Sequence, residues 1–469
     1  MTADASTMAH SLIGPMASAD PGSEAEFGLL NGIFDELFPI CRSITGPGLR
    51  QSLDILGGYM PLSRDSVASG EKVFDWEVPQ EWRIHTASLT HEDGTVYADF
   101  EVNNLHVVNY SEPVHIRISH EELAPHLHSL PHVPDAIPYV FSYYQRNWGF
   151  CISDTVRQSM PAGEYHAQIE SEFISGQLDF ADLVLPGETD SEILLTSYLC
   201  HPSMANNELS GPLVLLALYN RLARRRRRLT YRLALHPETI GAICYLFRRG
   251  EHLRNHLAGG LVLTCLGGPS QTLSYKRSRQ DTALIDQVVD IAGDVGIPPV
   301  DMRPFTPQNG SDERHYCSPG FNFPMGQMAR TVYSGEADWY HTSRDDKNFM
   351  GIDSLIRSAD EIDRLLQTFE YAGHFRNLFP FGEPQLGRRK LYPGVNSHQT
   401  WKQGSENQPT DPNFRKRMLF ILNYSDGAHS IIDIAQRCGC TVSDLIPVID
   451  ALEDAGLIRQ EMQEGPRCE

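Results

Sequence analysis

The polar loop at residues 198–211 constrains the fold of this chain more than any other segment. Just before it, residues 193–198 form a short apolar run bounded by polar residues, which is typical of a buried strand. A glycine and a proline then open the apolar run 213–218, which predicts a helix with proline near its first turn. His201 and Glu208 therefore lie at the carboxyl end of a strand, where open α/β sheets bind their ligands. They could form half of a metal site, or they could belong to a polar loop that only caps the helix.

Two later segments follow the same pattern. Residues 231–236 are predicted to form the next strand, and Glu238 follows in a strand-to-helix loop. Farther along the chain, His341 stands in another polar loop with acidic residues close behind it. Two histidines and a carboxylate are a common zinc ligand set, and a further glutamate often acts as general base. The ends of these strands can supply all four groups.

Five motifs occur in a defined order along the chain. They are His201 after a strand, residues 206–211 (Asn-Asn-Glu-Leu-Ser-Gly), residues 237–241 (Pro-Glu-Thr-Ile-Gly), Ser311-Asp312, and residues 341–345 (His-Thr-Ser-Arg-Asp). This order resembles that of the zinc aminopeptidase and carboxypeptidase superfamily. The resemblance implies an α/β fold with a zinc-exopeptidase-like mixed sheet flanked by helices.

The resemblance is closer to one aminopeptidase-like family with a small inserted β domain and a C-terminal winged helix. Residues 40–46 (Ile-Cys-Arg-Ser-Ile-Thr-Gly) and 143–150 (Tyr-Tyr-Gln-Arg-Asn-Trp-Gly-Phe) belong to the pattern of that family. The similarity extends from roughly residue 25 to residue 460, so it covers much more than one shared motif.

Three positions depart from this resemblance. Two-zinc aminopeptidases usually carry an aspartate at Asn207, a second glutamate at Thr239 and an aspartate at Thr264. Three of the five ligands implied by the resemblance are therefore neutral, and a second divalent cation would lack the anionic ligands that such ions select. We therefore expect a single zinc ion. The expected ligands, a set like that of single-zinc carboxypeptidases, are His201, Glu208 and His341.

Glu208 is one position after the usual ligand, so its use as a ligand requires the loop to be re-aimed. Asn207 or Asp312 could contact the metal in its place. Alternatively, Glu208 caps the following helix, whose N-terminus favours a carboxylate.

Glu238 is the expected general base. Zinc lowers the pKa of a bound water to about 7, and a carboxylate within hydrogen-bond reach can take its proton as the water attacks a carbonyl. The same glutamate can then give the proton to the leaving amine. The alternative role for Glu238 is that of an acidic cap on the next helix.

Other polar residues could bind substrate or support the ligands. Asp312 follows a glycine turn and could orient substrate or a histidine ligand, or form a simple Asx turn. Tyr340 and Arg344 flank the second histidine and could stabilise a developing oxyanion or hold a carboxylate. Asn207 joins this group if it does not contact the metal.

Charge and composition limit the partners of the chain. A net charge of -21 argues against general affinity for nucleic acid. No apolar run is long enough to span a membrane, no signal peptide is recognisable, and nine thinly spread cysteines fit reduced thiols. We expect a cytoplasmic protein that acts on a small peptide or amide, with no nucleic-acid or membrane partner. The sequence is compatible with a monomer and with a homo-oligomer.

A chain of 469 residues is expected to form two or three domains. The expected parts are a disordered tail at 1–25, a catalytic domain at 26–71 and 141–385, an inserted β domain at 72–140, a linker at 386–410 and a winged-helix domain at 411–469. The last helix of the winged-helix domain, at 441–454, carries four acidic residues and no Lys or Arg. Because phosphates would repel it, we expect this domain to contact protein rather than DNA.

Two classes of function follow from these patterns. The first is a zinc-dependent hydrolase of a peptide or amide bond. The second is a catalytically weak or inactive relative that serves as a regulatory or interaction protein, since several aminopeptidase ligands are missing. The joint presence of His201, Glu238 and His341 favours the hydrolase.

Overall fold

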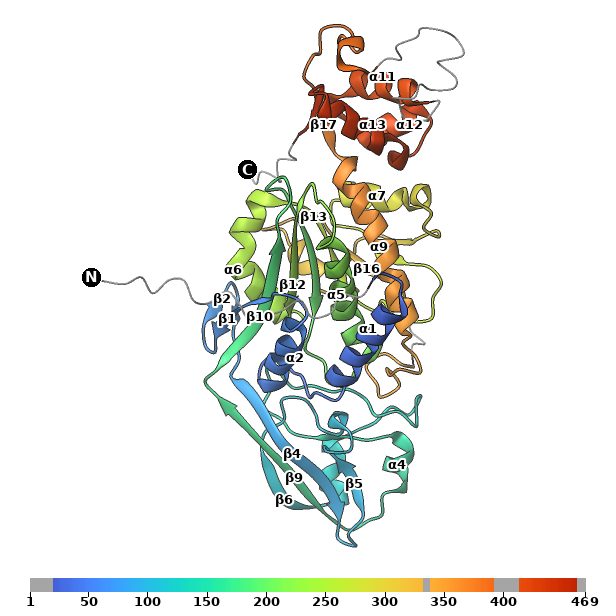
Figure 1. The fold of residues 1–469 in the computed structure, drawn as a ribbon. Helices are drawn as coiled ribbons and strands as arrows, with labels where there is room; N and C mark the ends of the chain where they lie inside the picture. Colours follow the sequence, from blue (N-terminus) through green and yellow to red (C-terminus); the bar gives the residue numbers. More distant parts are fainter. Residues whose placement is uncertain (1–19, 332–337, 392–412, 462–469) are drawn as a thin grey trace, which may run out of the picture.

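The molecule is elongated, with three parts arranged along its length (Figure 1). The computed structural model describes residues 20–331, 338–391 and 413–461. An eight-stranded sheet occupies the middle, a four-stranded sheet lies at one end, and a three-stranded sheet with its helices lies at the other. Most of the expected tail at 1–25 and of the expected linker at 386–410 lies outside the described residues.

The central sheet is mixed. Its strands are β1 (Ser63–Ala68), β10 (Gln177–Leu185), β11 (Glu192–Tyr198), β12 (Thr230–His236), β13 (Leu257–Leu263), β14 (Ser274–Lys276), β15 (Asp301–Arg303) and β16 (Met325–Ala329). Their order is β1-β10-β12-β11-β13-β16-β14-β15. The inner strands β12, β11, β13 and β16 run parallel, whereas β10 is antiparallel to both of its neighbours. Every residue of β11, β12 and β13 is buried, as is typical of parallel strands covered on both faces.

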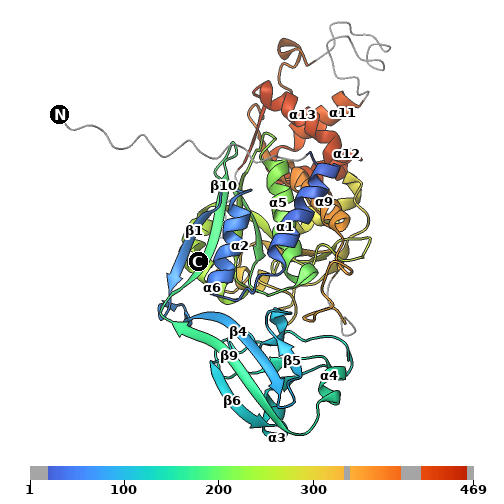
Figure 2. The same ribbon diagram turned by 60° about the horizontal axis from the view of Figure 1, so that its bottom comes forward.

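Helices cover both faces of this sheet, and Figure 2 shows the helices on one face. The flanking helices are α1 (Glu24–Leu37), α2 (Pro47–Gly57), α5 (Ser210–Leu222), α7 (Leu284–Asp290) and α9 (Ile352–Ala372) on one face, and α6 (Ile240–His256) and α8 (Glu313–Tyr316) on the other. Side chains alternate along β11, so Ile193 and Leu195 join one core while Leu194 joins the other. The expected α/β fold is confirmed. None of the described helices is both long and apolar enough to cross a membrane.

The insertion is built on a long antiparallel hairpin. Its sheet has the order β5-β4-β9-β6, with β4 (Glu81–His91), β5 (Val96–Asp99), β6 (Val114–Ser119) and β9 (Glu164–Ile174). Smaller elements are β2 (Lys72–Val73), β3 (Trp76–Glu77), η1 (Asn104–His106), α3 (His120–Leu123), η2 (Ala124–His126), β7 (Leu127–His128), β8 (Phe150–Cys151) and α4 (Asp154–Ser159). The inserted domain extends beyond the expected range of 72–140. Residues 165–174 of β9 pair with β4, so β9 belongs to the insertion although it directly precedes β10.

The C-terminal part is a winged helix. It contains β17 (His374–Asn377), α11 (Phe414–Tyr424), β18 (Asp426–Ser430), α12 (Ile431–Cys438), α13 (Val442–Asp454) and β19 (Ile458–Gln460). The strand order is β18-β17-β19. The middle strand, β17, follows directly after α9, so this part begins before the expected start at 411.

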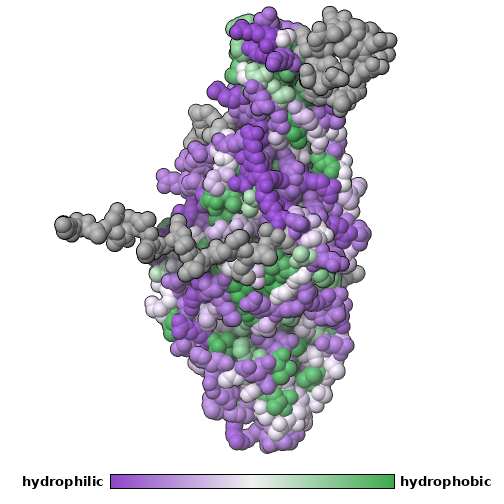
Figure 3. Space-filling model, viewed as in Figure 1, coloured by the Kyte–Doolittle hydropathy of each residue, from purple (hydrophilic) through white to green (hydrophobic). Residues whose placement is uncertain are grey.

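An ion pair joins this part to the central one. The guanidinium of Arg228, just before β12, donates to both carboxylate oxygens of Glu453 on α13, at 2.7 and 2.9 Å. Hydrophilic residues dominate the surface where the two parts meet (Figure 3).

Candidate active site

The two expected histidines and Glu238 meet at one edge of the central sheet. Tyr198 of β11 is the register partner of His236 in β12, so the loops that follow these strands start side by side. The ring centroids of His201 and His341 are 5.2 Å apart, and His201 Nε2 lies 3.7 Å from Glu238 Oε2. The sequence-based placement of these three side chains at strand ends therefore brings them into one cluster.

Glu208 lies behind His201 rather than between the two histidines. It is fully buried in η3, a π-helical turn (Ala205–Leu209) that leads into α5. Its Oε2 accepts a hydrogen bond from His201 Nδ1 at 2.7 Å, and its Oε1 accepts one from the backbone N–H of Cys200. Because Nδ1 of His201 is occupied in this way, Nε2 is the ring nitrogen directed toward Glu238.

Arg42 supports the pair of His201 and Glu208. It belongs to the motif at residues 40–46, to which the sequence assigned no role. The residue is fully buried, and its Nε lies 3.6 Å from Glu208 Oε1 and donates to the carbonyl of His201 at 2.9 Å. Burial lowers the pKa of Arg42, and the charge of Glu208 opposes this shift. The motif at residues 40–46 carries this arginine, so the motif was the available signal.

His341 has an unusual backbone conformation, with φ of +54°. Its ring stacks on that of Tyr340 at 3.9 Å. Its Nε2 is buried and has no hydrogen-bond partner within the described ranges. Burial, followed by the charge of His201, lowers the pKa of His341 to about 3, so its ring is held neutral and can donate a lone pair.

A segment of the inserted domain holds the His341 loop. The backbone N–H of Tyr139 donates to the carbonyl of His341 at 2.8 Å, and Ile137 exchanges hydrogen bonds with Ser343. The Tyr139 ring contacts both histidines edge-on, with centroid distances of 5.1 Å to His201 and 5.5 Å to His341. Sequence reasoning missed Tyr139, because no local pattern indicates that this segment crosses the site.

Asn207 has one unsatisfied atom at the site. Its backbone N–H donates to Asp345 Oδ2 at 2.8 Å, and its Nδ2 donates to the hydroxyl of Tyr198 at 3.2 Å. Its side-chain Oδ1 is buried without a hydrogen-bond partner in the part of the chain that the structure describes. Burial raises the pKa of Asp345 to about 7, although hydrogen bonds from the backbone of residues 206 and 207 favour its charged form.

Glu238 is fixed by two neighbours. Its Oε1 accepts a hydrogen bond from Ser311 Oγ at 3.0 Å, and its backbone N–H donates to Cys200 Sγ at 3.3 Å. The next residue, Thr239, has φ of +60°, and its N–H donates to Asp312 Oδ1 at 2.8 Å. Burial, followed by the charge of Glu238, raises the pKa of Asp312 well above its usual value. Asp312 therefore contacts the turn behind Glu238.

Arg344 pairs with Asp338 at 3.2 Å, and its side chain is 43% exposed. The hydroxyl of Thr264 is 2.6 Å from that of Tyr198, so this neutral residue is satisfied inside the protein.

The described residues contain one group of three potential ligand atoms within 4.8 Å of one another, from Cys200, His201 and Glu208. This group is poorly suited to a cation, because the Arg42 guanidinium already stands beside Glu208. Burial also raises the pKa of Cys200 to about 11, which favours the neutral thiol. The opposite side of His201, which faces Glu238, has no cation recorded next to it among the described residues. The His341 ring lies close to that of His201, and its Nε2 is buried without a partner among the described residues.

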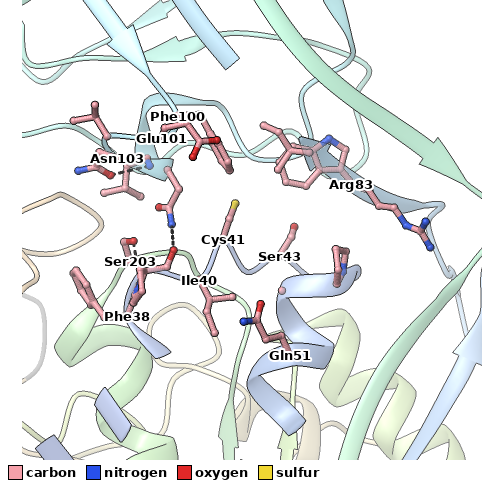
Figure 4. Close-up of a pocket in the computed structure, with 18 of the residues that line it drawn as sticks. Phe38, Ile40, Cys41, Ser43, Gln51, Arg83, Phe100, Glu101, Asn103 and Ser203 are labelled. Carbon is pink, nitrogen blue, oxygen red and sulfur yellow. Dashed lines mark hydrogen bonds between the residues drawn. The ribbon is translucent and has the colours of Figure 1, made fainter. Parts of the chain in front are cut away.

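A larger cavity of about 770 Å³ lies between the N-terminal segment and the inserted domain. Cys41 and Ser43 point into it from one side, and Phe100 and Glu101 line the other (Figure 4). Ser203 also lines this cavity, but His201, Glu238 and His341 do not. This cavity is therefore separate from the histidine cluster.

Comparison with protein families gives two matches. The model of a domain of unknown function (DUF4910) matches residues 32–372, and a winged helix-turn-helix model matches residues 373–460. A protein of Clostridium acetobutylicum is 38% identical over 432 residues, which covers 92% of this chain and 96% of that protein. Its provisional description is a polysaccharide biosynthesis protein with an aminopeptidase-like domain.

Solved structures show the same fold. A crystal structure of a protein from Clostridium acetobutylicum, provisionally described as a peptidase, has a TM-score of 0.80 and 36% identity, covering 93% of this chain and 97% of that chain. The zinc aminopeptidase BSAP from Bacillus subtilis has a TM-score of 0.53 and 12% identity, covering 73% of this chain and 93% of that chain. A peptidase M28 precursor from Shewanella amazonensis has a TM-score of 0.53 and 11% identity, covering 75% and 94%.

Proposed function

Because this chain belongs to the DUF4910 family and has an aminopeptidase-like fold with a C-terminal winged helix, we propose that it is a zinc-dependent hydrolase of a peptide or amide bond. The observation that carries the proposal is the cluster of two histidines with a glutamate, in which Glu238 Oε2 lies 3.7 Å from His201 Nε2. These groups supply two imidazoles and a carboxylate, which zinc hydrolases use as ligands and general base.

One zinc ion would be held by His201 and His341, each through Nε2. Asn207 Oδ1 is the natural third ligand, because it is buried and has no hydrogen-bond partner among the described residues. Glu208 then acts as the carboxylate that holds His201 from behind, a role that orients a ligating ring and raises its basicity. For Glu208 to ligate the metal, it would have to release His201, Cys200 and Arg42 together.

When bound, zinc would acidify the attacking water and polarise the scissile carbonyl. Glu238 takes the proton of the water through a carboxylate oxygen and then delivers it to the leaving nitrogen. Ser311 holds the other carboxylate oxygen through its hydroxyl group, so Glu238 keeps one oxygen for proton transfer. Asp312 fixes the turn through the N–H of Thr239, and this contact keeps the Glu238 side chain aimed at the cluster.

An inactive regulatory protein is the second candidate function. The observation that favours it is the neutrality of Asn207, Thr239 and Thr264, and the hydroxyl of Thr264 is satisfied by Tyr198. Such a site would lack the charge needed for two metal ions.

Turnover distinguishes the two functions. The zinc-loaded protein would be incubated with a panel of aminoacyl amides, dipeptides and N-acylated amines, and the products would be identified by mass. The hydrolase proposal predicts cleavage of at least one amide, and addition of a chelator should abolish it. The absence of cleavage across the panel, together with the absence of bound zinc, would favour the regulatory protein.

We also propose that the protein acts in a reducing compartment such as the cytoplasm. Eight cysteines among the described residues are unpaired, and six of them are buried. Free buried thiols are typical of proteins that are kept reduced.

A further inference from the structure

The segment Tyr143 to Phe150 matches a family motif, but the proposed chemistry gives it no role. Its first four residues, 143–146, line a groove of about 470 Å³. The opposite wall is formed by residues 77–80, and Phe173 at the end of β9 closes the groove. This groove is separate from the cavity of Figure 4.

Aromatic rings connect the histidine cluster with the groove. The Tyr139 ring, which contacts His201, lies 5.7 Å from that of Phe141, and Phe141 stacks on Tyr143 at 4.4 Å. Tyr143 in turn contacts Tyr110 at 5.3 Å. One row of aromatic rings thus leads from the groove to the histidine cluster, and Phe141 in this row is half exposed.

The groove also exposes a flat aromatic face. Tyr144 is 55% exposed, and its ring is braced edge-on by Trp76 at 5.5 Å. A rigid, exposed ring with a polar hydroxyl tip offers contact area at a low cost in side-chain entropy.

Planar polar groups surround this ring. Gln80, Gln145 and Glu77 lie along the groove, with Ser142 and Ser175 at its edges. Arg146 is the one cation among the described lining residues; its guanidinium lies 3.6 Å above the Phe173 ring and donates to Gln80. The groove thus combines apolar ring faces with amide, carboxylate and hydroxyl groups.

We propose that this groove binds a saccharide, so that the substrate of the hydrolase is an amide carried by a sugar. A sugar ring has an apolar C–H face that can cover Tyr144 and a rim of hydroxyls that can pair with the amides and carboxylate. The statement about the substrate rests on the proposed hydrolase function, whereas the statement about the groove does not.

Other ligands fit the groove less well. A phosphate-bearing ligand would need several cations, but Arg146 is already engaged by Gln80 and the carboxylate of Glu77 also lines the groove. An extended peptide would need free backbone groups at a strand edge. Here the N–H groups of residues 70, 78, 142 and 145 already donate to backbone carbonyls.

Calorimetric titration of the full chain with the β-1,4-linked trimer of N-acetylglucosamine tests the proposal. This probe carries sugar rings and amides together. We expect saturable binding with a Kd of about 1 mM or tighter, and a loss of about tenfold in affinity in Tyr144→Ala. Tyr144→Phe keeps the ring and should retain most of the affinity. Phe381→Ala is the matched control, because Phe381 is almost fully exposed and does not line the groove.

Equal affinity in Tyr144→Ala and the unchanged chain would overturn the proposal. So would the failure of the trisaccharide, and of every sugar on a glycan array, to bind. Binding of a short aromatic peptide, with no binding of sugars, would assign the groove to peptides instead.

Repeating the titration on metal-stripped protein separates this proposal from the hydrolase function. Neither His201 nor His341 lines the groove, so the Kd for the trisaccharide should not change. Saccharide binding without hydrolysis of any amide would retain the groove and refute the hydrolase. Hydrolysis of simple peptides without saccharide binding would retain the hydrolase and refute the saccharide groove.

Discussion

His201 Nδ1 lies 2.7 Å from Glu208 Oε2, and the opposite ring nitrogen of the same histidine faces Glu238 at 3.7 Å. One histidine thus separates two glutamates. The first is buried and paired with Arg42, whereas the second keeps a partly exposed carboxylate. In the proposed mechanism, this division gives Glu208 a positioning role and leaves Glu238 available for proton transfer.

Replacement of Glu208 by glutamine should weaken zinc binding without abolishing it. The amide oxygen can still accept from His201 Nδ1 but lacks the charge, and such supporting partners change metal affinity by about 10- to 100-fold. Competition with a chromogenic chelator measures the change. Glu188→Gln, at a surface pair with Arg226, is the control and should bind zinc normally. If Glu208→Gln loses zinc as completely as His341→Ala, Glu208 is itself a ligand.

Glu208→Gln should also destabilise the folded protein, because Arg42 loses the carboxylate charge of Glu208. A buried guanidinium left without its partner destabilises the folded state by about 3 to 5 kcal/mol. Urea unfolding of Arg42→Met, Glu208→Gln and the double variant measures this coupling. The double variant should lose less stability than the sum of the single variants. Additive losses would mean that the 3.6 Å pair contributes no coupling.

Replacement of Glu238 by glutamine should leave zinc in place and reduce kcat. General-base catalysis contributes about 10²- to 10⁴-fold, so a loss of that size is expected with little change in KM. Ser311→Ala removes only the hydrogen bond to Oε1 and should have a smaller effect. A Glu238→Gln variant that retains full turnover would show that another group accepts the proton.

His236 should make the protein less stable in acid. Burial lowers the pKa of His236 to about 4, because its ring is enclosed next to Thr196 and Tyr316. A depressed folded-state pKa means that the full stability is present above the unfolded value of about 6.5 and is lost as the pH falls toward 4. The expected loss at pH 4 is about 3 kcal/mol in the free energy of unfolding.

Urea unfolding between pH 7 and pH 4 measures this loss, with His236→Asn as the variant. The variant should start less stable and show a shallower dependence on pH. His85→Asn is the control, because His85 is largely exposed and should leave the dependence unchanged. The same slope in His236→Asn and the unchanged chain would assign the acid sensitivity to other groups.

Arg228 should hold the winged helix against the central domain. Its two hydrogen bonds to Glu453 are partly shielded from water, and its guanidinium also lies 4.6 Å from the centre of the Tyr371 ring. Arg228→Ala should therefore speed amide hydrogen exchange in α13 and β19 without changing exchange in β11. Arg226→Ala, at an 81% exposed side chain, should leave all three elements unchanged. Unaltered exchange in Arg228→Ala would show that apolar packing alone fixes the domain.

The sequence indicated the fold and the meeting of the strand-end residues for a clear physical reason. The run 193–198 is buried on both faces, and parallel strands end at the same edge of a sheet. The winged helix, which the family resemblance implied, is likewise confirmed.

The orientation of Glu208 could not be predicted in the same way. The direction of its carboxylate depends on the π-helical turn at 205–209 and on Arg42, which comes from the far N-terminal segment. Tyr139 is similar, since it reaches the histidines only because the insertion folds back across the site. Long-range contacts of this kind leave no local period in the sequence.

The zinc content of the purified, zinc-supplemented protein tests the central claim most directly. Elemental analysis should find about one zinc per chain, and almost none in His201→Ala and in His341→Ala. No zinc in the unchanged protein, or an unchanged zinc content in both variants, would contradict the account.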